Sequence, residues 1–319
     1  MRTVIYGAGG IGSVVGGYLK LAGQDVILVG RPGHVRAIND RGLRIISPSG
    51  TRLVRLNAVT GADELEFRDG DVSFLCVKGQ DTERALDQMA PAGSNVPVFC
   101  FQNGVRNEAL AARFVKDVYG VMVDMWVEYL VDGEVTVRAD PPGRFVIGRY
   151  PSGTDPVIET VAAGLRSAGF YVKVTPDVMP YKWGKLIANL GNAVDAVCKA
   201  KPQDVAFIYH AARREARDIL SGAGVSLVSL KDLDREWPES AARTVSGEGH
   251  GSTWQSLARR GAAVETDFLN GEIVRLARRL GLPAPVNEGL LRLCEEMVAR
   301  REPPGKYTGD ELAGLLGLK

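Results

Sequence analysis

A glycine pattern near the amino terminus is the first feature that could bind a ligand. The stretch VIYGAGGIGSVVGGYL contains Gly7-x-Gly9-x-x-Gly12 between an expected strand at residues 3–6 and an expected helix at 10–21. Gly7 permits a tight turn, Gly9 lets the backbone approach a pyrophosphate, and Gly12 allows the helix to pack closely on the strand. In this setting the pattern predicts a dinucleotide site, with a purely structural glycine turn as the alternative.

The residues around this loop indicate which dinucleotide binds. Gly10 and Ile11 open the helix, whose N-terminal amides and dipole favour phosphate. An NAD site usually has Asp or Glu about 20 residues after the loop, bonded to the ribose 2′-hydroxyl. Arg31 follows the second expected strand at this place, and a guanidinium can grip a 2′-phosphate. We therefore expect NADP(H) as the cofactor, with Arg36 as a second phosphate ligand or a solvated helix residue.

Two further polar residues end apolar runs typical of strands that are buried on both faces of a parallel sheet. Lys78 ends VSFLCVK, and Asn103 follows VPVFCFQ. Ligands on doubly wound sheets bind beyond the carboxyl ends of the strands. Lys78 could thus add positive charge near the adenosine phosphates, and Asn103 could bond the nicotinamide ribose or the substrate. The alternative for each is a polar residue that only ends a strand.

A third group lies on an expected helix at residues 182–199, which contains KWGKLIANLGNAVDAV. On a helical wheel its polar side carries Lys182, Lys185, Asn189, Asn192 and Lys199. This side is either a wet face or the wall of a cleft. A typical wet face has several charged residues, whereas the middle of this one has neutral amides, with Gly184 and Gly191 at its margin. Because small residues let another body come close, we favour a cleft wall.

The order of apolar runs indicates the elements that position these residues. Strands are expected near 3–6, 25–29, 43–46, 52–59, 72–78, 96–104, 119–131, 134–138, 144–148 and 170–174, with helices between several of them. Further helices are expected at 182–199, 203–222, 254–260, 264–280, 286–300 and 309–317. We therefore predict an α/β fold: an N-terminal Rossmann-type doubly wound sheet at 1–176 that binds NADP, and an all-helical domain at 177–319 for substrate binding and dimerisation. Substrate would lie between the two domains.

Composition narrows the classes of function. The chain has 39 Lys and Arg against 38 Asp and Glu, which gives no electrostatic case for nucleic acid or an anionic membrane. Four cysteines and three histidines are widely spaced, so no metal or redox motif is indicated. We expect neither a signal peptide nor a membrane-spanning helix. No basic region followed by an apolar one stands before the first strand, and there is no unbroken run of about 18 apolar residues. We therefore expect a cytoplasmic protein with no metal, no nucleic-acid partner and no membrane partner.

Five segments carry a family resemblance. They are GAGGIG with Arg31, CVKGQDT, QNG, KWGKLIANLGNA and GSTWQSLARRGAAVETDFLNGEI, and together they span residues 4–288. In this order they resemble the ketopantoate reductase (2-dehydropantoate 2-reductase) family. The resemblance implies hydride transfer from NADPH to the ketone carbon of a small 2-keto acid, in pantothenate biosynthesis.

The resemblance also implies roles for single residues. Lys185 would donate a proton to the nascent alkoxide, and Glu265 would contact the cofactor and orient the lysine. Substrate contacts are implied at Asn103, Asn189, Ser252 and Thr253. The chemistry agrees, because an ammonium group both donates a proton and stabilises developing negative charge.

One position departs from the family pattern. The family usually has a second asparagine eight residues after the lysine, where this chain has Ala193, and Asn192 stands one residue earlier. On a continuous helix this moves the amide by about 100°. The leading expectation is therefore reduction of ketopantoate to pantoate. The alternatives are reduction of a different small 2-keto acid and a non-catalytic NADP(H)-binding sensor.

Overall fold

The computed structural model describes residues 1–93, 95–247, 249–259 and 264–318. The chain divides into two compact units: the first contains residues 1–182 and 231–249, and the second contains residues 183–230 and 250–319. The boundary expected after residue 176 assigns residues 231–249 to the helical domain, whereas in the structure this segment belongs to the first unit. The predicted fold class, a largely parallel sheet followed by a helical region, is confirmed.

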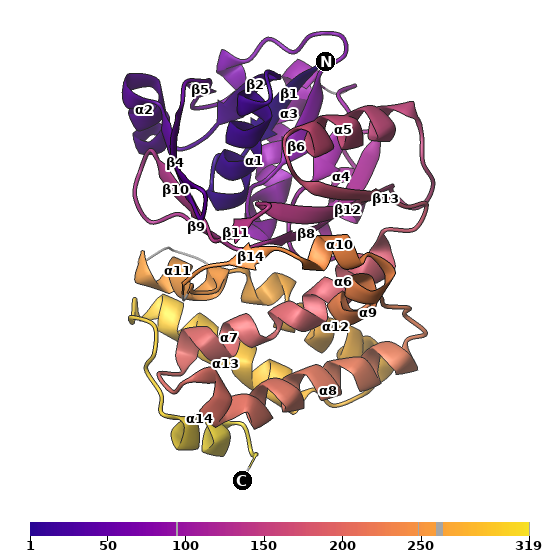
Figure 1. The fold of residues 1–319 in the computed structure, drawn as a ribbon. Coiled ribbons are helices and arrows are strands. Elements are labelled where there is room, and N and C mark those ends of the chain that lie inside the picture. Colours follow the sequence, from indigo (N-terminus) through magenta and orange to yellow (C-terminus); the bar gives the residue numbers. More distant parts are fainter. Residues whose placement is uncertain (94, 248, 260–263, 319) are drawn as a thin grey trace. The chain divides into compact units, whose positions relative to one another are not determined.

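The first unit is built around an eight-stranded sheet, whose strands run through the upper part of Figure 1 in the order β13–β12–β8–β7–β6–β1–β2–β5. These strands are β1 (Arg2–Tyr6), β2 (Asp25–Val29), β5 (Asn57–Val59), β6 (Val72–Leu75), β7 (Val98–Cys100), β8 (Val118–Met125), β12 (Gly143–Arg149) and β13 (Tyr171–Val174). The β8–β12 pair is antiparallel, and the other neighbours pair in parallel. Such a sheet brings the carboxyl ends of β2, β1, β6 and β7 to one edge.

Helices cover both faces of this sheet. Alternate residues of β1 point to opposite faces, so Ile5 joins a core cluster with α1 (Gly10–Leu21) and α5 (Pro156–Ser167). Val4 joins a second cluster with α3 (Thr82–Gly93), and α4 (Asn107–Ala111) packs beside α3. This double cover explains why the central strands are apolar along their whole length.

A second, four-stranded sheet in the first unit has the order β4–β3–β10–β9. Its strands are β3 (Leu43–Ser47), β4 (Gly50–Val54), β9 (Val127–Glu128) and β10 (Glu134–Val137). The expected strand at 52–59 is therefore two strands, β4 and β5, in different sheets. The expected strand at 119–131 likewise divides into β8 and β9. β9 and β10 pair antiparallel, and the chain between them turns at VDGE.

Residues 231–249 return to the first unit, which the sequence did not indicate. They contain most of α9 (Leu230–Glu236), with α10 (Pro238–Ala241) and β14 (Thr244–Val245), and β14 pairs antiparallel with β11 (Ala139–Asp140). The Arg144 side chain is 4% exposed and needs partners. It donates to Asp124 at 2.6 Å, and also to Asp234 and Ser240 of the returning segment.

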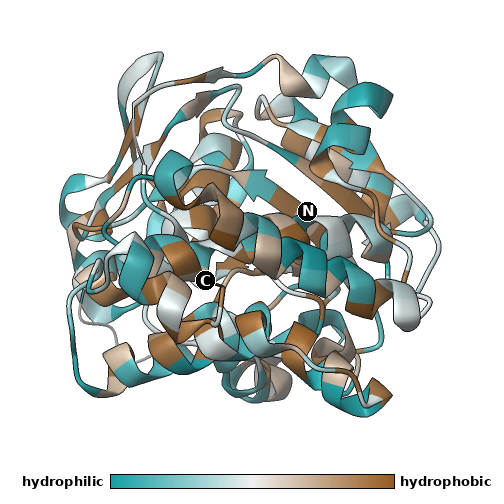
Figure 2. Ribbon diagram, turned by 90° about the horizontal axis from the view of Figure 1, so that it is seen from below, coloured by the Kyte–Doolittle hydropathy of each residue, from teal (hydrophilic) through white to brown (hydrophobic). Residues whose placement is uncertain are grey.

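The second unit is helical, and its elements carry apolar residues on one side and polar residues on the other (Figure 2). They are α6 (Met179–Asn189, whose first turn belongs to the first unit), α7 (Gly191–Val197), η3 (Pro202–Val205), α8 (Ala206–Gly222), α11 (Ser252–Ala258), η4 (Glu265–Phe268), α12 (Asn270–Leu280), α13 (Pro285–Ala299) and α14 (Gly309–Leu315). The core of this unit comes mainly from α7, α8, α13 and α14. The expected helix at 264–280 is η4 followed by α12, and residue 260, the expected end of another helix, lies outside the described residues.

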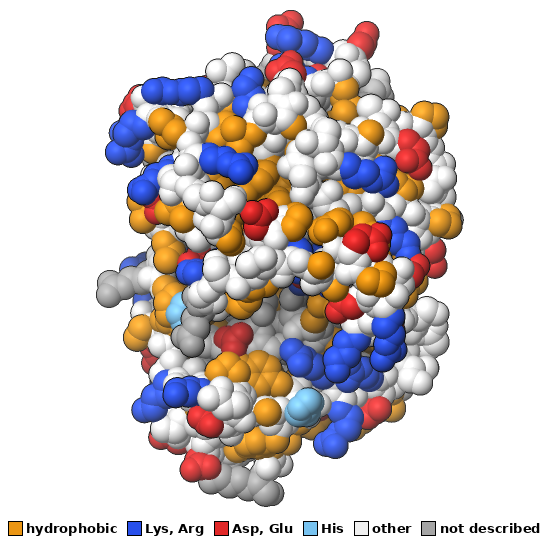
Figure 3. All heavy atoms as spheres, in the orientation of Figure 1, with side chains coloured by type: hydrophobic (Ala, Val, Ile, Leu, Met, Phe, Trp, Pro, Cys, Tyr) orange, Lys and Arg blue, Asp and Glu red, His pale blue; other side chains and the backbone are white. Residues whose placement is uncertain are grey.

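Two surface properties bear on partners. Within the described ranges, no helix has both the length and the apolar composition needed to span a bilayer. Basic and acidic side chains are both distributed over the face shown in Figure 3, in keeping with a net charge of +1.

Candidate functional site

The glycine loop joins β1 to α1 in a conformation that requires two of its glycines. Gly7 has a φ of +113°, and a Cβ there would lie 2.5 Å from the backbone nitrogen of Val77. A Cβ on Gly12 would overlap the carbonyl oxygen of Gly7. At Gly9, by contrast, no described atom beyond its chain neighbours lies within 4 Å of the Cβ position. The loop therefore has open space at the glycine expected to face a pyrophosphate.

The N-terminus of α1 is suited to an anion. Gly9 is its N-cap and offers no side-chain cap, and the first turn, which begins with Gly10 and Ile11, contains no acidic residue. The first four amides of a helix have no partner within the helix, and the helix dipole is positive at this end. The loop and the helix start thus fit the phosphates of a dinucleotide.

Arg31 lies at the end of β2, as the exposed N-cap residue of α2 (Pro32–Arg41). Gly30 before it packs on the glycine loop, because a Cβ there would lie 2.8 Å from the Cβ of Ala8. Among the described residues no carboxylate pairs with the Arg31 guanidinium, and the first turn of α2 has no acidic residue. Arg36 is also exposed, on α2.

Lys78 and Asn103 follow neighbouring strands. Lys78 comes after β6 as the N-cap of η2 (Gly79–Asp81), and Asn103 comes after β7. Since β2, β1, β6 and β7 are adjacent and parallel, the structure places Arg31, the glycine loop, Lys78 and Asn103 at the same edge of the sheet.

A buried ion pair that sequence reasoning missed lies next to Asn103. Lys182 and Glu108 form it, and their side chains are 1% and 0% exposed. The Lys182 ammonium also donates to the carbonyl oxygens of Gln102 at 3.1 Å and Val121 at 3.2 Å. Burial, and then the charge of Glu108, raise the pKa of the neighbouring Cys100 thiol, which Lys182 opposes. Cys100 is therefore a protonated core thiol rather than a nucleophile.

Polar side chains connect the Lys182–Glu108 pair to the loops that follow β6 and β7. The Gln102 side chain donates to the carbonyl oxygen of Val77 at 2.9 Å and to the Thr82 hydroxyl at 2.8 Å. That hydroxyl donates to Asn107 at 3.0 Å, and the Asn107 amide donates to the carbonyl oxygen of Asn103 at 2.8 Å. We call Lys182, Glu108, Gln102, Thr82 and Asn107 the strand-end network. It holds the backbone before Lys78 and at Asn103.

The helix expected at 182–199 is interrupted at Leu190, between α6 and α7. Lys185 and Asn189 are both partly exposed on α6, which fits a solvated face as well as a cleft wall. Lys182 does not share their surroundings, because it is buried in the strand-end network, whereas Lys199 is exposed. The expectation of one continuous polar side was therefore wrong.

The two glycines at the margin of this side make room for the chain itself. A Cβ on Gly184 would overlap the carbonyl oxygen of Val228, and one on Gly191 would lie 2.6 Å from the ring of Tyr209. The body that these glycines let come close is therefore another part of the chain.

Asn192 and Ala193 lie just after the interruption and differ in their surroundings. Ala193 is 1% exposed and belongs to the helical core. Asn192 is partly exposed and lies against Gly251 at the start of α11, where a glycine Cβ would be 3.1 Å from its Oδ1. Leu190 itself keeps helical dihedral angles (φ −57°, ψ −28°), and its amide donates to the Leu186 carbonyl oxygen at 3.1 Å, so the interruption is local.

Ser252 and Thr253 lie at the start of α11, which packs against α7 and η4. Thr253 is 1% exposed, and among the described residues neither its hydroxyl nor that of Ser252 has a hydrogen-bond partner. Buried hydroxyls are normally bonded, so both are suited to a ligand. Glu265 opens η4 and is 7% exposed. The second unit thus contains Lys185, Asn189, Ser252, Thr253 and Glu265.

Side chains from distant helices hold the interruption at Leu190. The Asn270 amide donates to the Leu190 carbonyl oxygen at 3.4 Å and to Asn287 at 3.0 Å. Asn287 donates to Glu215, whose carboxylate also accepts two amides at the start of α13. Arg213 donates to the Ala188 carbonyl oxygen at 3.1 Å. We call Asn270, Asn287, Glu215 and Arg213 the helix-break network.

An aromatic pair stands directly before and within α11. The rings of His250 and Trp254 are stacked, with centroids 3.6 Å apart and planes 10° from parallel. Trp254 also packs against the helical core, so its ring is fixed on one side. Thr253 is its chain neighbour, which makes the pair a candidate wall for an apolar part of a ligand.

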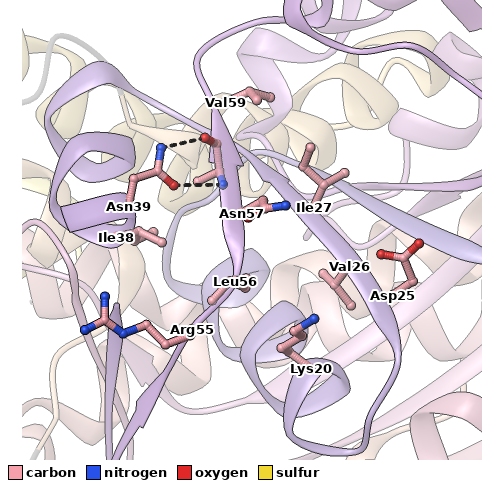
Figure 4. A pocket seen from close by; sticks show the side chains of 11 residues that line it. Lys20, Asp25, Val26, Ile27, Ile38, Asn39, Arg55, Leu56, Asn57 and Val59 are labelled. Atoms are coloured by element: carbon pink, nitrogen blue, oxygen red, sulfur yellow. Dashed lines mark hydrogen bonds between the residues drawn. The ribbon is translucent and has the colours of Figure 1, made fainter. Parts of the chain in front are cut away.

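A separate pocket lies along β2 and β5 (Figure 4). Its polar side chains are those of Lys20, Asp25, Asn39, Arg55 and Asn57. Asn39 is occupied by two hydrogen bonds with the backbone of Ala58, at 2.9 and 3.1 Å. None of the predicted site residues lines this pocket, and we assign it no role.

Comparison with known proteins gives the family. The family model described as Ketopantoate reductase PanE/ApbA matches residues 3–152, and that of its C-terminal part matches residues 177–298. The chain is 30% identical to a 2-dehydropantoate 2-reductase of Pyrococcus abyssi, over 90% of this chain and 94% of the relative. The chain belongs to the ketopantoate reductase family.

Solved structures agree with this membership. A PanE/ApbA family ketopantoate reductase from Ralstonia eutropha JMP134 matches with a TM-score of 0.76 and 30% identity, over 94% of this chain and 99% of that one. A D-mandelate dehydrogenase, solved with NADH and anilino(oxo)acetate, matches with a TM-score of 0.78. At 20% identity, over 94% of this chain and 99% of that one, it shows only the shared fold.

Membership confirms the predicted resemblance and the predicted class of enzyme. The chain is an oxidoreductase, and its family reduces a keto acid with a pyridine nucleotide. The alternative of a non-catalytic sensor has no support from these relatives.

Proposed function

We propose that this protein reduces 2-dehydropantoate to pantoate with NADPH. The observation that carries the proposal is membership of the ketopantoate reductase family across both of its family models. The residues of the chain support it: one unit contains a glycine loop with Arg31 beside it, and the other contains Lys185, Asn189, Thr253 and Glu265.

The proposed chemistry requires one hydride and one proton. When bound, the reduced nicotinamide supplies the hydride to the ketone carbon. The Lys185 ammonium donates its proton to the carbonyl oxygen, which becomes the hydroxyl of the product, and the neutral amine then regains a proton from solvent. Glu265 orients Lys185, while Asn189, Ser252 and Thr253 bind the substrate. General acid catalysis of this kind contributes roughly 10²–10⁴-fold to a rate.

Preference for NADPH over NADH is proposed from the end of β2. Arg31 is exposed there without a carboxylate partner among the described residues, and no acidic residue stands in its place to bind a ribose 2′-hydroxyl. A guanidinium beside the adenosine ribose would bind a 2′-phosphate in a charge-assisted manner. Lys78 and Asn103 complete the proposed cofactor set with Gly7, Gly9, Gly10, Ile11 and Gly12.

A second candidate substrate is a bulkier 2-keto acid. The stacked pair of His250 and Trp254 favours it, because a flat apolar group could pack against a ring that is already fixed. Ala193 stands where the family usually has a second asparagine. Its side chain is 1% exposed and offers no amide to a substrate.

One experiment separates the cofactor and the substrate proposals. The purified protein is assayed with ketopantoate, pyruvate, 2-ketoisovalerate and phenylglyoxylate, each with NADPH and with NADH. We expect kcat/KM to be highest for ketopantoate with NADPH. A higher kcat/KM for phenylglyoxylate would favour the bulkier keto acid over ketopantoate as the substrate. Equal kcat/KM values with NADPH and NADH would contradict the proposed preference for NADPH.

A cytoplasmic location and a homodimer are also part of the proposal. The four cysteines are free thiols in the structure, as expected in a reducing compartment. Dimerisation through the helical domain is checked by light scattering of the eluted protein, where the mass of a single 34.3 kDa chain would contradict it.

A further inference from the structure

The strand-end network contains two full charges that burial makes expensive. The side chains of Lys182 and Glu108 are 1% and 0% exposed. A buried ion pair can often be replaced by apolar residues of similar volume without loss of stability. Stability alone therefore does not account for this pair in the core of the first unit.

The contacts of Lys182 indicate what the charge does. Its ammonium donates to the carbonyl oxygen of Gln102, two residues beyond the end of β7, and to that of Val121, within the adjacent strand β8. An apolar side chain could fill the same volume but could not bond these oxygens. The charged pair thus fixes backbone that apolar packing would leave unbonded.

From Gln102 the hydrogen bonds continue to the loops after β6 and β7, which carry Lys78 and Asn103. The Gln102 amide holds the carbonyl oxygen of Val77, directly before Lys78. Asn107 holds the carbonyl oxygen of Asn103 itself and is bonded to Gln102 through Thr82. Displacement of Gln102 would therefore shift the backbone that carries Lys78 and Asn103.

We propose that Lys182 and Glu108 are positioning residues for the cofactor, which act by holding the loops after β6 and β7. The proposal rests on the proposed function for the roles of Lys78 and Asn103. It adds two residues, distant in sequence from each other, to those on which nucleotide affinity depends.

The test compares three variants with the wild-type protein. Lys182→Met leaves the Glu108 carboxylate without its partner, and Lys182→Met combined with Glu108→Leu removes both charges. The matched control is Arg2→Met with Asp71→Leu. This ion pair is also largely buried, with side chains 12% and 2% exposed, but it lies at the amino ends of β1 and β6.

Three quantities are measured: the Kd for NADPH by fluorescence titration, hydrogen exchange of residues 101–107, and the midpoint of urea unfolding. In both Lys182 variants we expect Kd to rise about tenfold and residues 101–107 to exchange faster. The double variant should recover the unfolding midpoint that Lys182→Met loses, while its Kd stays raised. The control should change the midpoint alone.

Two results would overturn the proposal. One is a double variant that recovers the wild-type Kd along with its stability, since filling the volume would then suffice. The other is unchanged exchange of residues 101–107 in both Lys182 variants. If the wild-type protein binds neither NADPH nor NADH, the proposed function fails, and the exchange measurement still decides whether the pair positions the loop.

Discussion

The strand-end network and the helix-break network fix different kinds of backbone with different kinds of side chain. In the first unit, Lys182, Gln102 and Asn107 donate to backbone oxygens just beyond β6 and β7, and Glu108 pairs with Lys182. In the second unit, Asn270 and Arg213 donate to backbone oxygens at and beside an interrupted helix, while Asn287 donates to Ala212 of α8 and Glu215 caps α13. The first fixes loops whose backbone is expected to meet a cofactor. The second fixes a helix whose side chains are expected to meet a substrate.

The difference follows from the local backbone. A strand end in a parallel sheet leaves carbonyl oxygens beyond the last ladder bond, and a buried one needs a donor from elsewhere. A helix interruption leaves only the carbonyl oxygens of one turn, and here the Asn270 amide and the partly exposed Arg213 satisfy two of them. The strand-end network, whose two charges are almost completely buried, is therefore expected to be more sensitive to the loss of one member.

The largest effect on activity should come from Lys185, which is partly exposed on α6. Lys185→Ala is expected to lower kcat roughly 10²–10⁴-fold by removing the proton donor, with the Kd for NADPH nearly unchanged. Steady-state kinetics and fluorescence titration measure the two quantities. Lys199→Ala is the control, because Lys199 is exposed and should leave kcat unchanged. Wild-type turnover in Lys185→Ala would remove this lysine from the mechanism.

The next effect compares the networks directly. Glu108→Leu leaves Lys182 as an uncompensated buried charge and should cost about 3–5 kcal/mol of unfolding free energy. Asn270→Leu leaves the Leu190 carbonyl oxygen and Asn287 without a neutral donor, and should cost about 1–3 kcal/mol. Urea unfolding of both variants gives the order. If Asn270→Leu were the more damaging change, charge would not be what distinguishes the networks.

A smaller effect is expected at the exposed end of β2. Arg31→Ala should raise KM for NADPH about tenfold, because a charge-assisted hydrogen bond to phosphate is lost at an exposed position. KM for NADH should not change, since NADH has no 2′-phosphate. Arg36→Ala, one helical turn further on, is the comparison. A larger change in Arg36→Ala would transfer the phosphate contact to that residue.

The smallest effect is expected outside both networks, at Asp155. Burial alone would raise the pKa of this carboxyl, but bonds from the Tyr119 hydroxyl, the Ile158 amide and Arg149 outweigh burial and lower it. A lowered folded-state pKa stabilises the fold above the unfolded pKa, and this stability is lost as pH falls through the folded value. Asp155→Asn also weakens the N-cap of α5 and should cost about 1 kcal/mol near neutral pH.

Thermal unfolding of wild type and Asp155→Asn from pH 7 to pH 2 measures this effect. The difference in Tm should shrink as pH falls below about 4, where the unfolded carboxyl takes up its proton. A constant difference across this range would mean that Asp155 contributes only as a cap.

Much of the sheet edge with the glycine loop and Lys78 could be predicted, because the sequence patterns that indicate it are local. The turn at Gly7 and the apolar run before Lys78 each depend on a few adjacent residues. The interruption at Leu190 could not be predicted in this way. Leu190 is a good helix former, and the bonds that hold the break come from Asn270 and Arg213, far away in sequence.

The burial of Lys182 was missed for the same reason. On a wheel it falls on the polar side with Lys185, but its partner Glu108 comes from α4, in the part of the chain that forms the sheet. Glu108 in turn looks like an ordinary residue of a short exposed helix. Long-range pairing of opposite charges leaves no periodic pattern, so a single sequence does not reveal it.

The returning segment has a consequence for how the protein can be cut. The backbone passes from one unit to the other at 182/183, at 230/231 and at 249/250. A fragment that stops near residue 176 therefore lacks Asp234, Ser240 and Arg243, and Arg144 keeps only part of its buried contacts. The first unit is consequently not a module that a single truncation or a simple domain swap can isolate.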